Sequence, residues 1–288
     1  MKFEQYTAFA AEQWKSTMGS SEHFSLEKCS DEEKIKVWDK MADTYDLALG
    51  SDPRRVHSAL SRLRALGALG AGKTALDIGS GTGAYALALA EHCERVYALD
   101  SSPGMRQVML SKAREKGICN VTALDADWKR VGLSELPTKL DLVLSSLNTG
   151  INDYDSLVKM NEVSCGFCCY IAPYGTAKHS RRRAFQEIVF GRTLNAAGGN
   201  DIIHAFNIIY GLGYQPELTY AASEWTRADA PEEALSAVCR EYGRYMSIDE
   251  KLRARLEEYI RANLNEAGLF EQTQSSQLGI MIWDTRTR

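Results

Sequence analysis

The chain has 288 residues, 44% of them hydrophobic, 25% charged and 9% aromatic, which is typical of a globular protein with one elaborated domain or two small ones. A formal net charge of −4 argues against a protein that coats nucleic acid, because such a protein needs a basic surface to displace phosphate counterions. No apolar run approaches the ~20 residues that span a bilayer, and the first residues lack the pattern of a secretory signal, so we expect a cytoplasmic protein without membrane contact.

Two amphipathic helices are predicted before the first strand. Ser30-Asp-Glu-Glu33 is a capping box, and apolar residues recur at helical spacing from Ile35 to Leu49. A second helix opens at Asp52-Pro53, and glycines from position 67 end it. Residues 1–60 are thus expected to form an N-terminal helical cap on a core that spans 61–288.

Strands and helices then alternate, which is typical of a doubly wound α/β fold with a mostly parallel sheet. Because helices cover both faces of such a sheet, its strands are expected to be short apolar runs. Helices are predicted at 83–93, 104–116 and 153–163. The strands are predicted at Thr74–Ile78, Arg95–Asp100, Asn120–Asp125, Leu140–Ser145 and Phe167–Ala172.

After the fifth strand the order is less regular. We expect a basic helix near 179–194, a helix at 201–210, a sixth strand at 216–225 and a final strand at 277–283. Two more helices are expected near 231–245 and 248–266, the latter opened by a second capping box, Ser247-Ile-Asp-Glu250. The segments near 178–200 and 226–275 are predicted to be helical lid insertions after strands 5 and 6, which pack together over an acceptor chamber.

The strongest chemical signal is Leu76-Asp77-Ile-Gly79-Ser-Gly81-Thr-Gly83 at the first strand-to-helix junction. Glycines there let the backbone turn and approach a ligand, and the amides at the helix start face that ligand. The spacing also fits the dinucleotide pattern G-x-G-x-x-G/A, so an NAD-dependent oxidoreductase stays open. Asp77 argues against a dinucleotide-binding fold, because such a fold normally has an apolar residue at this position. The carboxylate of Asp77 suits a cationic amino-acid ligand instead.

Acidic residues also follow the next two strands. Asp100 lies 21 residues after Gly79 (100 minus 79), where a carboxylate can accept hydrogen bonds from both ribose hydroxyls of a nucleoside. Asp127 and Trp128 follow the third strand, and the indole can supply a stacking face. Because the carboxyl ends of parallel strands meet at one crevice, these residues predict a single nucleoside site.

With these motifs the chain resembles the class I S-adenosylmethionine-dependent methyltransferases, well over residues 35–175 and in outline over the last hundred residues. The resemblance implies a seven-stranded sheet whose last strand is antiparallel, and S-adenosylmethionine as cofactor. It assigns the methionine end of the donor to Tyr45, Asp77, Gly79, Gly81 and Gly83. The remaining donor-binding residues are Asp100 at the ribose, Met105, Asp127 and Trp128 at the adenine, and Ser145 at the end of the fourth strand.

The acceptor side carries weaker signals. After the fourth strand the chain lacks the [N/D]-P-P-[Y/F] tetrapeptide of enzymes that methylate amino groups of bases or of glutamine. Asn148, Tyr174 and His179 are the candidates for orienting the acceptor or moving its proton. Basic residues at 178–183 either neutralise an anionic acceptor or form a solvated helix face.

Seven cysteines, an odd number, favour reduced thiols over a disulfide framework. Cys165, Cys168 and Cys169 cluster at the fifth strand, and soft thiolates bind metal ions. Neighbouring strand residues point to opposite faces, however, so Cys168 and Cys169 cannot converge on one ion. We predict that the cluster serves packing, and that the chain holds no metal, since its five histidines lack ligand spacing.

The sequence therefore predicts methyl transfer from S-adenosylmethionine to a small or medium-sized acceptor, anionic ones included. The expected partner is this small molecule, with no nucleic acid and no membrane, and the expected state is a monomer or homodimer. The alternative to an enzyme is a non-catalytic regulatory or partner subunit that binds the same nucleoside.

Overall fold

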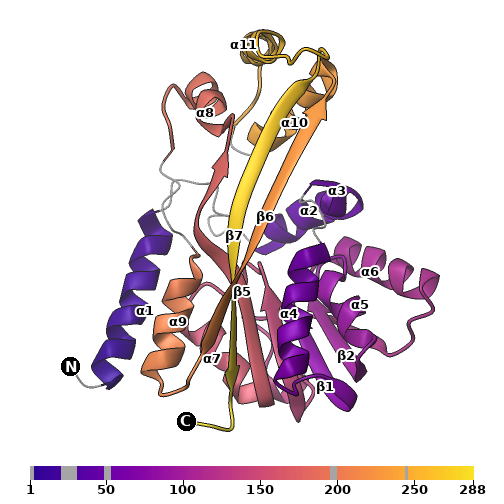
Figure 1. Ribbon diagram of the computed structural model, residues 1–288, viewed down its shortest axis with the longest axis vertical. Helices are drawn as coiled ribbons and strands as arrows, with labels where there is room; N and C mark the ends of the chain where they lie inside the picture. Colours follow the sequence, from indigo (N-terminus) through magenta and orange to yellow (C-terminus); the bar gives the residue numbers. More distant parts are fainter. Residues whose placement is uncertain (1–2, 21–30, 49–52, 195–199, 244–245) are drawn as a thin grey trace.

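The computed structural model describes residues 3–20, 31–48, 53–194, 200–243 and 246–288 (Figure 1). Its centre is one seven-stranded sheet in the order β3-β2-β1-β4-β5-β7-β6. Strands β1 to β5 are parallel, whereas β7 is antiparallel to both β5 and β6. The bounds are β1 Gly70–Ile78, β2 Cys93–Asp100, β3 Val121–Asp125, β4 Leu140–Ser146, β5 Ser164–His179, β6 Glu217–Asp229 and β7 Phe270–Asp284. The predicted doubly wound, mostly parallel sheet is confirmed.

Helices cover both faces of the sheet and build two apolar cores. On one face α4 (Pro53–Ala65), α5 (Ala84–Ala90) and α6 (Pro103–Glu115) bury residues such as Leu63 and Met109. On the other face lie α7 (Tyr154–Val163) and α9 (Ile202–Gly211), with Met160 and Ile208 fully buried. Strands with cover on both sides have no solvent face, which explains the unbroken apolar runs in β1 and β4.

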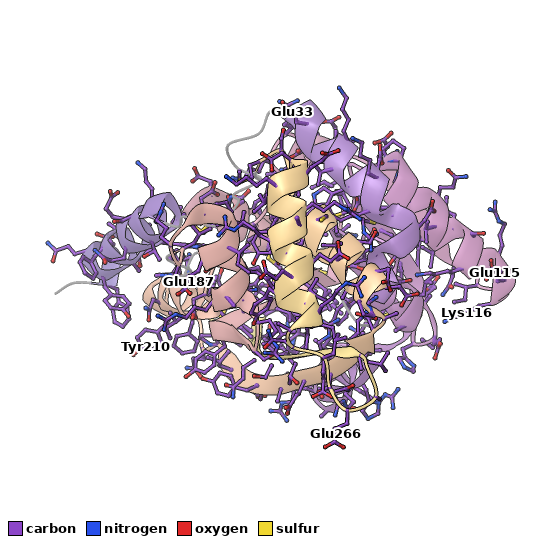
Figure 2. All side chains as sticks on the ribbon, turned by 90° about the horizontal axis from the view of Figure 1, so that it is seen from above. Glu33, Glu115, Lys116, Glu187, Tyr210 and Glu266 are labelled. Carbon is purple, nitrogen blue, oxygen red and sulfur yellow. The ribbon has the colours of Figure 1, made fainter. Side chains whose placement is uncertain are left out.

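The first helix, α1 (Phe3–Ser20), packs on α9 and not beside the rest of the predicted cap. Trp14 is fully buried there, and the Tyr6 hydroxyl donates to Asn207 Oδ1 at 3.0 Å. A Cβ on Gly211 would lie 2.4 Å from Thr7 Oγ1, so the two helices meet at a glycine. In the view from above, Tyr210 of α9 lies toward α1, away from Glu33 (Figure 2). Only part of the span 1–60 therefore lies at the cap.

The cap consists of α2 (Asp31–Met41), the short 3-10 helix η2 (Ala42–Thr44) and α3 (Tyr45–Ala48). These elements lie near the start of α6, on the side where the parallel strands end (Figure 1). The residues at the predicted ends of the cap helices, Ser30, Leu49 and Asp52, lie outside the described residues.

Strands β5, β6 and β7 are longer than the sequence predicts and rise beyond the other strands as a ribbon (Figure 1). The β6–β7 ladder runs from the pair Glu217–Ile282 to the pair Asp229–Phe270. At its far end α8 (Arg182–Phe190), α10 (Pro231–Tyr242) and α11 (Glu250–Arg261) surround Phe270 in a third apolar core. We call these three helices with Phe270 the ribbon tip. The two insertions thus pack together, as predicted.

Two predicted helix starts are wrong. His179 lies on β5, opposite Gln274, and the basic helix begins at Arg182. Helix α11 is capped by Asp249, whose carboxylate accepts from the Leu252 amide at 2.7 Å, and not by Ser247. Aspartate is as good an N-cap residue as serine, and Asp249 lies only two residues after Ser247, so residue preference alone does not distinguish the two as the start of the helix. In the described part of the chain, no helix combines the length and apolar character that a membrane crossing requires.

Candidate functional site

The loop after β1 is built by glycines that adopt left-handed conformations. Gly79, Gly81 and Gly83 have φ values of 69°, 53° and 89°. A Cβ on Gly79 would lie 2.5 Å from the Cγ of Asn148, so neither its conformation nor its surroundings accept a side chain. Gly83 caps α5, and a Cβ there would lie 2.5 Å from the Cγ of Met109 on α6. It therefore permits helix packing and lines neither cavity, whereas Gly79 and Gly81 line both.

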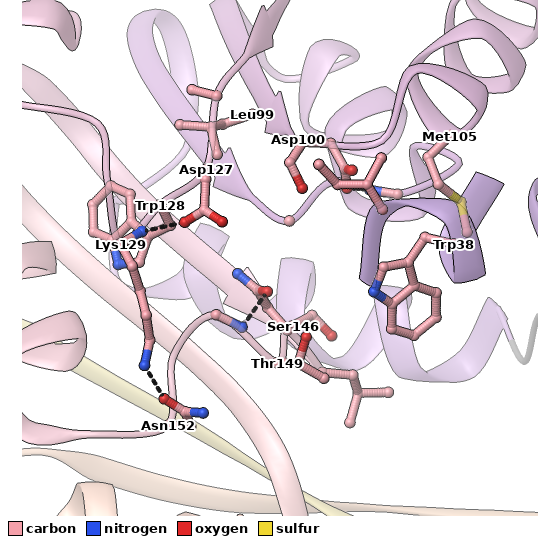
Figure 3. Close-up of a pocket in the computed structure, with 18 of the residues that line it drawn as sticks. Trp38, Leu99, Asp100, Met105, Asp127, Trp128, Lys129, Ser146, Thr149 and Asn152 are labelled. Carbon is pink, nitrogen blue, oxygen red and sulfur yellow. Dashed lines mark hydrogen bonds between the residues drawn. The ribbon is translucent and has the colours of Figure 1, made fainter. Parts of the chain in front are cut away.

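Two adjoining cavities open at this loop, at the carboxyl edge of the parallel strands. The larger, of about 220 Å³, lies between the cap and the ends of β2, β3 and β4 (Figure 3). The smaller, of about 80 Å³, lies between the loop, α3, α4 and α5. Leu147, at their junction, holds a φ of 52°, a backbone conformation uncommon for a branched residue. The residues shared by both cavities are Tyr45, Gly79, Gly81, Ser146 and Leu147.

Asp100 lines the larger cavity at the end of β2. Its Oδ2 accepts from the Gly81 amide and its Oδ1 from the Ser102 amide, both at 2.8 Å. Burial raises the pKa of Asp100 above its usual value, although these two amides act in the opposite direction. The carboxylate is thus fixed in orientation beside the glycine loop. Met105, in the first turn of α6, is almost fully buried and lines the same cavity.

Asp127 and Trp128 form another part of the wall. The Asp127 carboxylate accepts from the Lys129 amide at 2.8 Å and lies at the cavity (Figure 3). The Trp128 indole is only 2% exposed, its Nε1 donates to the Ser156 carbonyl at 2.8 Å, and the Lys159 ammonium lies 4.6 Å from its ring centre. Trp128 therefore borders the cavity from within the apolar core, and the face it leaves for stacking is small.

At the end of β4 the structure places Ser146, and not Ser145, at the site. Ser145 is buried, donates to the Ile78 carbonyl at 3.1 Å and lines neither cavity. Successive strand residues point to opposite faces of the sheet, so the side chain of Ser145 is buried while that of Ser146, one position later, lines both cavities.

Asp77 lies in the smaller cavity, where its carboxylate accepts from the Ala86 amide and keeps one unsatisfied oxygen. The residue is 2% exposed, and its Oδ2 has no hydrogen-bond partner among the described residues. Burial raises the pKa of Asp77 from 3.8 to about 7, and the nearby Asp100 adds to this shift. A buried carboxylate without a partner is costly unless a cation binds beside it.

Arg55 of α4 lines the same smaller cavity and was not predicted from the sequence. Burial raises the pKa of the Tyr45 phenol above its usual value and that of the Tyr85 phenol to about 12. The positive charge of Arg55 acts in the opposite direction on both phenols, but its effect is smaller. The cavity therefore presents a cationic and an anionic side chain. Arg55 lies within an ordinary amphipathic helix, PRRVHSALSRLRA, in which no motif distinguishes it.

The acceptor candidates are not brought together. Asn148 lines the larger cavity, where its Oδ1 accepts from the Gly150 amide at 2.8 Å and its Nδ2 donates to the Ile78 carbonyl at 3.3 Å. Tyr174 lies on the ribbon, 39% exposed, with its ring 4.5 Å from that of Tyr220, and it lines neither cavity. The side chain of His179 lies outside the described residues.

The arginines after β5 stabilise the ribbon tip. Arg181 donates to Asn263 Oδ1 at 3.1 Å and lies over the ring of Phe270. Arg183 pairs with Glu187 one turn along α8 at 2.9 Å. Neither lines a cavity, so these two side chains do not supply the anion site that the basic stretch suggested.

The fold and the paired cavities define the class of the protein, and the comparisons with known proteins agree. Residues 75–163 match a family model described as a methyltransferase domain. This segment runs from β1 to α7 and contains the glycine loop and Asp100, so the loop belongs to a methyltransferase domain and not to a dinucleotide-binding one. Residues 75–163 of the chain therefore match a methyltransferase domain, and the sheet around them has the fold of the solved methyltransferase structures.

Among individual proteins, an uncharacterized protein of Haemophilus influenzae (strain ATCC 51907 / DSM 11121 / KW20 / Rd) is 28% identical over 154 residues, 52% of this chain and 53% of that protein. The chain thus spans about half the length of this curated relative. A Bacillus halodurans C-125 protein assigned as a methyltransferase has the same fold, with a TM-score of 0.51 and 12% identity over 82% of this chain and 99% of that one. The YcgJ protein from Bacillus subtilis gives a TM-score of 0.48 and 13% identity over 78% and 97%.

The cysteine cluster divides between the two cores. Cys168 faces α7, where its thiol donates to the Met160 carbonyl at 3.4 Å, and Cys169 is buried on the α4–α5 face. Burial raises the pKa of both thiols well above the usual range. Over the described ranges, no three His, Cys, Asp or Glu side chains are grouped to hold a metal ion.

We expect the double variant Cys168→Ala, Cys169→Ala to lose roughly 1–2 kcal/mol of unfolding free energy per site, because each change leaves a small cavity, and to keep full methyl transfer. Thermal denaturation and turnover, measured on the same samples, check this. Activity lost from a normally folded variant would show that a thiol takes part in the chemistry.

Proposed function

We propose that the protein transfers the methyl group of S-adenosylmethionine to a small or medium-sized acceptor. The observation that carries this proposal is the pair Asp77 and Arg55 in one small cavity beside the glycine loop. The methionine end of the donor is a zwitterion, so its ammonium group suits Asp77 and its carboxylate suits Arg55 and the Tyr45 hydroxyl. The adjoining larger cavity offers Asp100 to the ribose and Met105 to the adenine.

Tyr45, Ser146 and Leu147 line both cavities and would hold the part of the donor that joins its methionine end to its nucleoside. The bound donor supplies an electrophilic methyl group. A lone pair of the acceptor forms the new bond to the methyl carbon while the carbon–sulfur bond breaks, and its electrons stay on sulfur as S-adenosylhomocysteine leaves. The side chains at the junction hold the two reactants in line and keep water out.

The position of the cap supports an acceptor of limited size. Ile35 and Trp38 of α2 and Tyr45 of α3 form a wall over the carboxyl edge, so a broad polymer surface would have to displace the cap to reach the junction. No described residue of α8, α10 or α11 lines either cavity. The wall that limits the acceptor is therefore the cap, and not the two lid insertions that the sequence suggested. With Arg181 and Arg183 engaged elsewhere, we do not include an anionic group in the proposed acceptor.

Turnover of donor labelled in its methyl group, measured against a panel of small metabolites, tests the proposal. Label transferred to one class of acceptor supports an enzyme of this kind. The small acceptor would be contradicted if the protein bound S-adenosylhomocysteine tightly but transferred the labelled methyl group to a protein or nucleic acid and to no member of the panel. Binding with no transfer to any substrate would favour the regulatory subunit.

Asp100→Ala is expected to weaken S-adenosylhomocysteine binding by roughly 10- to 150-fold, because hydrogen bonds to a charged group contribute ~1.5–3 kcal/mol. Calorimetric titration of wild type and variant measures the change. Asp125→Ala is the matched control, since Asp125 ends the neighbouring strand, is 73% exposed and lines neither cavity. An unchanged affinity in Asp100→Ala would place the ribose elsewhere.

A further inference from the structure

The cap is fastened to α6 by the carboxylate of Asp39. This residue of α2 accepts from the Gly104 amide at 2.9 Å and from the Ser102 hydroxyl. Ser102 is itself the N-cap of α6 and accepts from the Met105 amide at 3.2 Å. Asp39 therefore binds at the positive end of a helix dipole, where a carboxylate is stabilised. The same helix start carries Met105 into the larger cavity.

A second carboxylate fastens the other end of the cap to the glycine loop. Asp46 of α3 accepts from the Thr82 hydroxyl at 2.6 Å and from the Lys112 ammonium, which also donates to the Thr82 carbonyl at 3.2 Å. Burial raises the pKa of Asp46, but the hydrogen bonds from Lys112 and Thr82 outweigh it and lower the pKa below its usual value. The carboxylate therefore stays ionised, and the contact persists, throughout the neutral range.

At the first of the two contact points the cap and α6 meet at a glycine. A Cβ on Gly104 would lie 3.1 Å from Asp39 Oδ1 and 3.3 Å from the Cβ of Ala42, closer than side-chain carbons normally approach. Glycine at this position lets the backbones of the cap and α6 come into contact. Asp39 faces α6 and lines neither cavity, so its contacts serve the position of the cap and not the ligand.

We infer that Asp39 and Asp46 form a two-point clamp that closes the cap over the donor, and that opening of this clamp sets the rate of donor and product exchange. Trp38 and Tyr45, which directly precede the two aspartates in the chain, line the larger cavity. A ligand enclosed by these side chains leaves only when the cap moves away from α6. The inference rests on the proposed function, and within it Asp39 is a positioning residue, whereas Asp46 also lines the smaller cavity.

The dissociation rate of S-adenosylhomocysteine, followed by stopped-flow tryptophan fluorescence, tests the clamp. Asp39→Ala is expected to raise this rate by about 10-fold, since it removes two hydrogen bonds to a charged group, with a smaller rise in Asp39→Asn, which retains one acceptor oxygen. The matched control is Asp43→Ala, an exposed aspartate of the same cap that lines neither cavity, and its rate is expected to equal that of wild type. Gly104→Val, which displaces the cap from the α6 side, is expected to act like Asp39→Ala.

Steady-state kinetics separates positioning from a loss of stability. A clamp variant is expected to raise the KM for the donor and, where product release limits turnover, to raise kcat. A merely destabilised variant would lower the ligand-free melting temperature and leave the dissociation rate unchanged. Wild-type dissociation rates in Asp39→Ala and Gly104→Val, with the variants folded, would overturn the clamp alone. Failure of wild type to bind S-adenosylhomocysteine would instead overturn the proposed function.

Discussion

Asp77→Asn is expected to weaken S-adenosylhomocysteine binding by roughly 150- to 5,000-fold at pH 8, because removing one partner of a buried ion pair costs ~3–5 kcal/mol. The carboxylate is buried and accepts from the Ala86 amide, but its Oδ2 has no hydrogen-bond partner in the described structure, and the proposed partner of this oxygen is the ligand ammonium group. Calorimetric titration at several pH values measures the effect. Asp125→Asn, at an exposed strand end, is the control.

The pH dependence of binding has a definite sign. Burial raises the pKa of Asp77 to about 7, and only the ionised carboxylate pairs with an ammonium group. Binding below this pH therefore releases a proton, and affinity is expected to fall by up to about tenfold per pH unit as the pH drops below 7 and to be level above it. Asp77→Asn should show no such slope. A slope that persists in the variant would assign the titration to another group.

The stability of the ligand-free protein follows the opposite course. Because the pKa of Asp77 is raised from 3.8 to about 7 on folding, the folded state holds the proton more tightly than the unfolded state. This group therefore favours folding at low pH, and its contribution is lost as the pH rises from about 4 to 7. Melting temperatures measured with and without S-adenosylhomocysteine at pH 5 and pH 8 should show the largest ligand-induced rise at pH 8.

Gly79→Ala is expected to reduce S-adenosylhomocysteine affinity at least about 100-fold, because a collision with a neighbouring side chain adds to the backbone strain, which costs ~1–3 kcal/mol. The added Cβ would lie 2.5 Å from the Asn148 side chain, which is held by Gly150 and Ile78. Asn148 must then leave these partners and enter the larger cavity. Titration of the variant and of the double variant Gly79→Ala, Asn148→Ala measures how much affinity returns once the amide group is removed.

A glycine outside the site provides the control for backbone strain. Gly67, after α4, has a φ of 73°, and a Cβ there would meet nothing within 4 Å. Gly67→Ala is therefore expected to lose stability but to bind S-adenosylhomocysteine as wild type does. If the double variant binds no better than Gly79→Ala, the collision with Asn148 is not the cause of the loss.

The central strands were predictable because one physical condition fixes them. Leu142, Val143 and Leu144 are fully buried between two helical layers, so the strand is an apolar run whose limits are visible in the sequence. The glycine loop was predictable for a related reason, since a left-handed backbone leaves little choice of residue. Asp77 and Asp100 follow from their positions at the strand ends.

Other residues carry no such local mark. Arg55 reaches the smaller cavity because of the way α4 lies across the sheet, which is a tertiary property and not a pattern of spacing. Whether Ser145 or Ser146 lines the cavities depends on which face of β4 is covered at its last residues, and the local sequence does not show this. The outer part of the ribbon escaped the prediction because its residues, such as Gln272 and Arg227, are polar and lack the alternation that indicates a half-buried strand.

The ribbon tip has an apolar core of its own. Its apolar cluster, with Leu235, Val238 and Leu256 around Phe270, is separate from the two cores that flank the sheet. Cooperative units of this kind open with free energies that differ from the global value. The amide hydrogens of α10 and α11 should therefore exchange with solvent together and faster than those of β1 and β4. Such a unit can gain, lose or exchange residues over evolution while the nucleoside-binding half of the molecule keeps its stability.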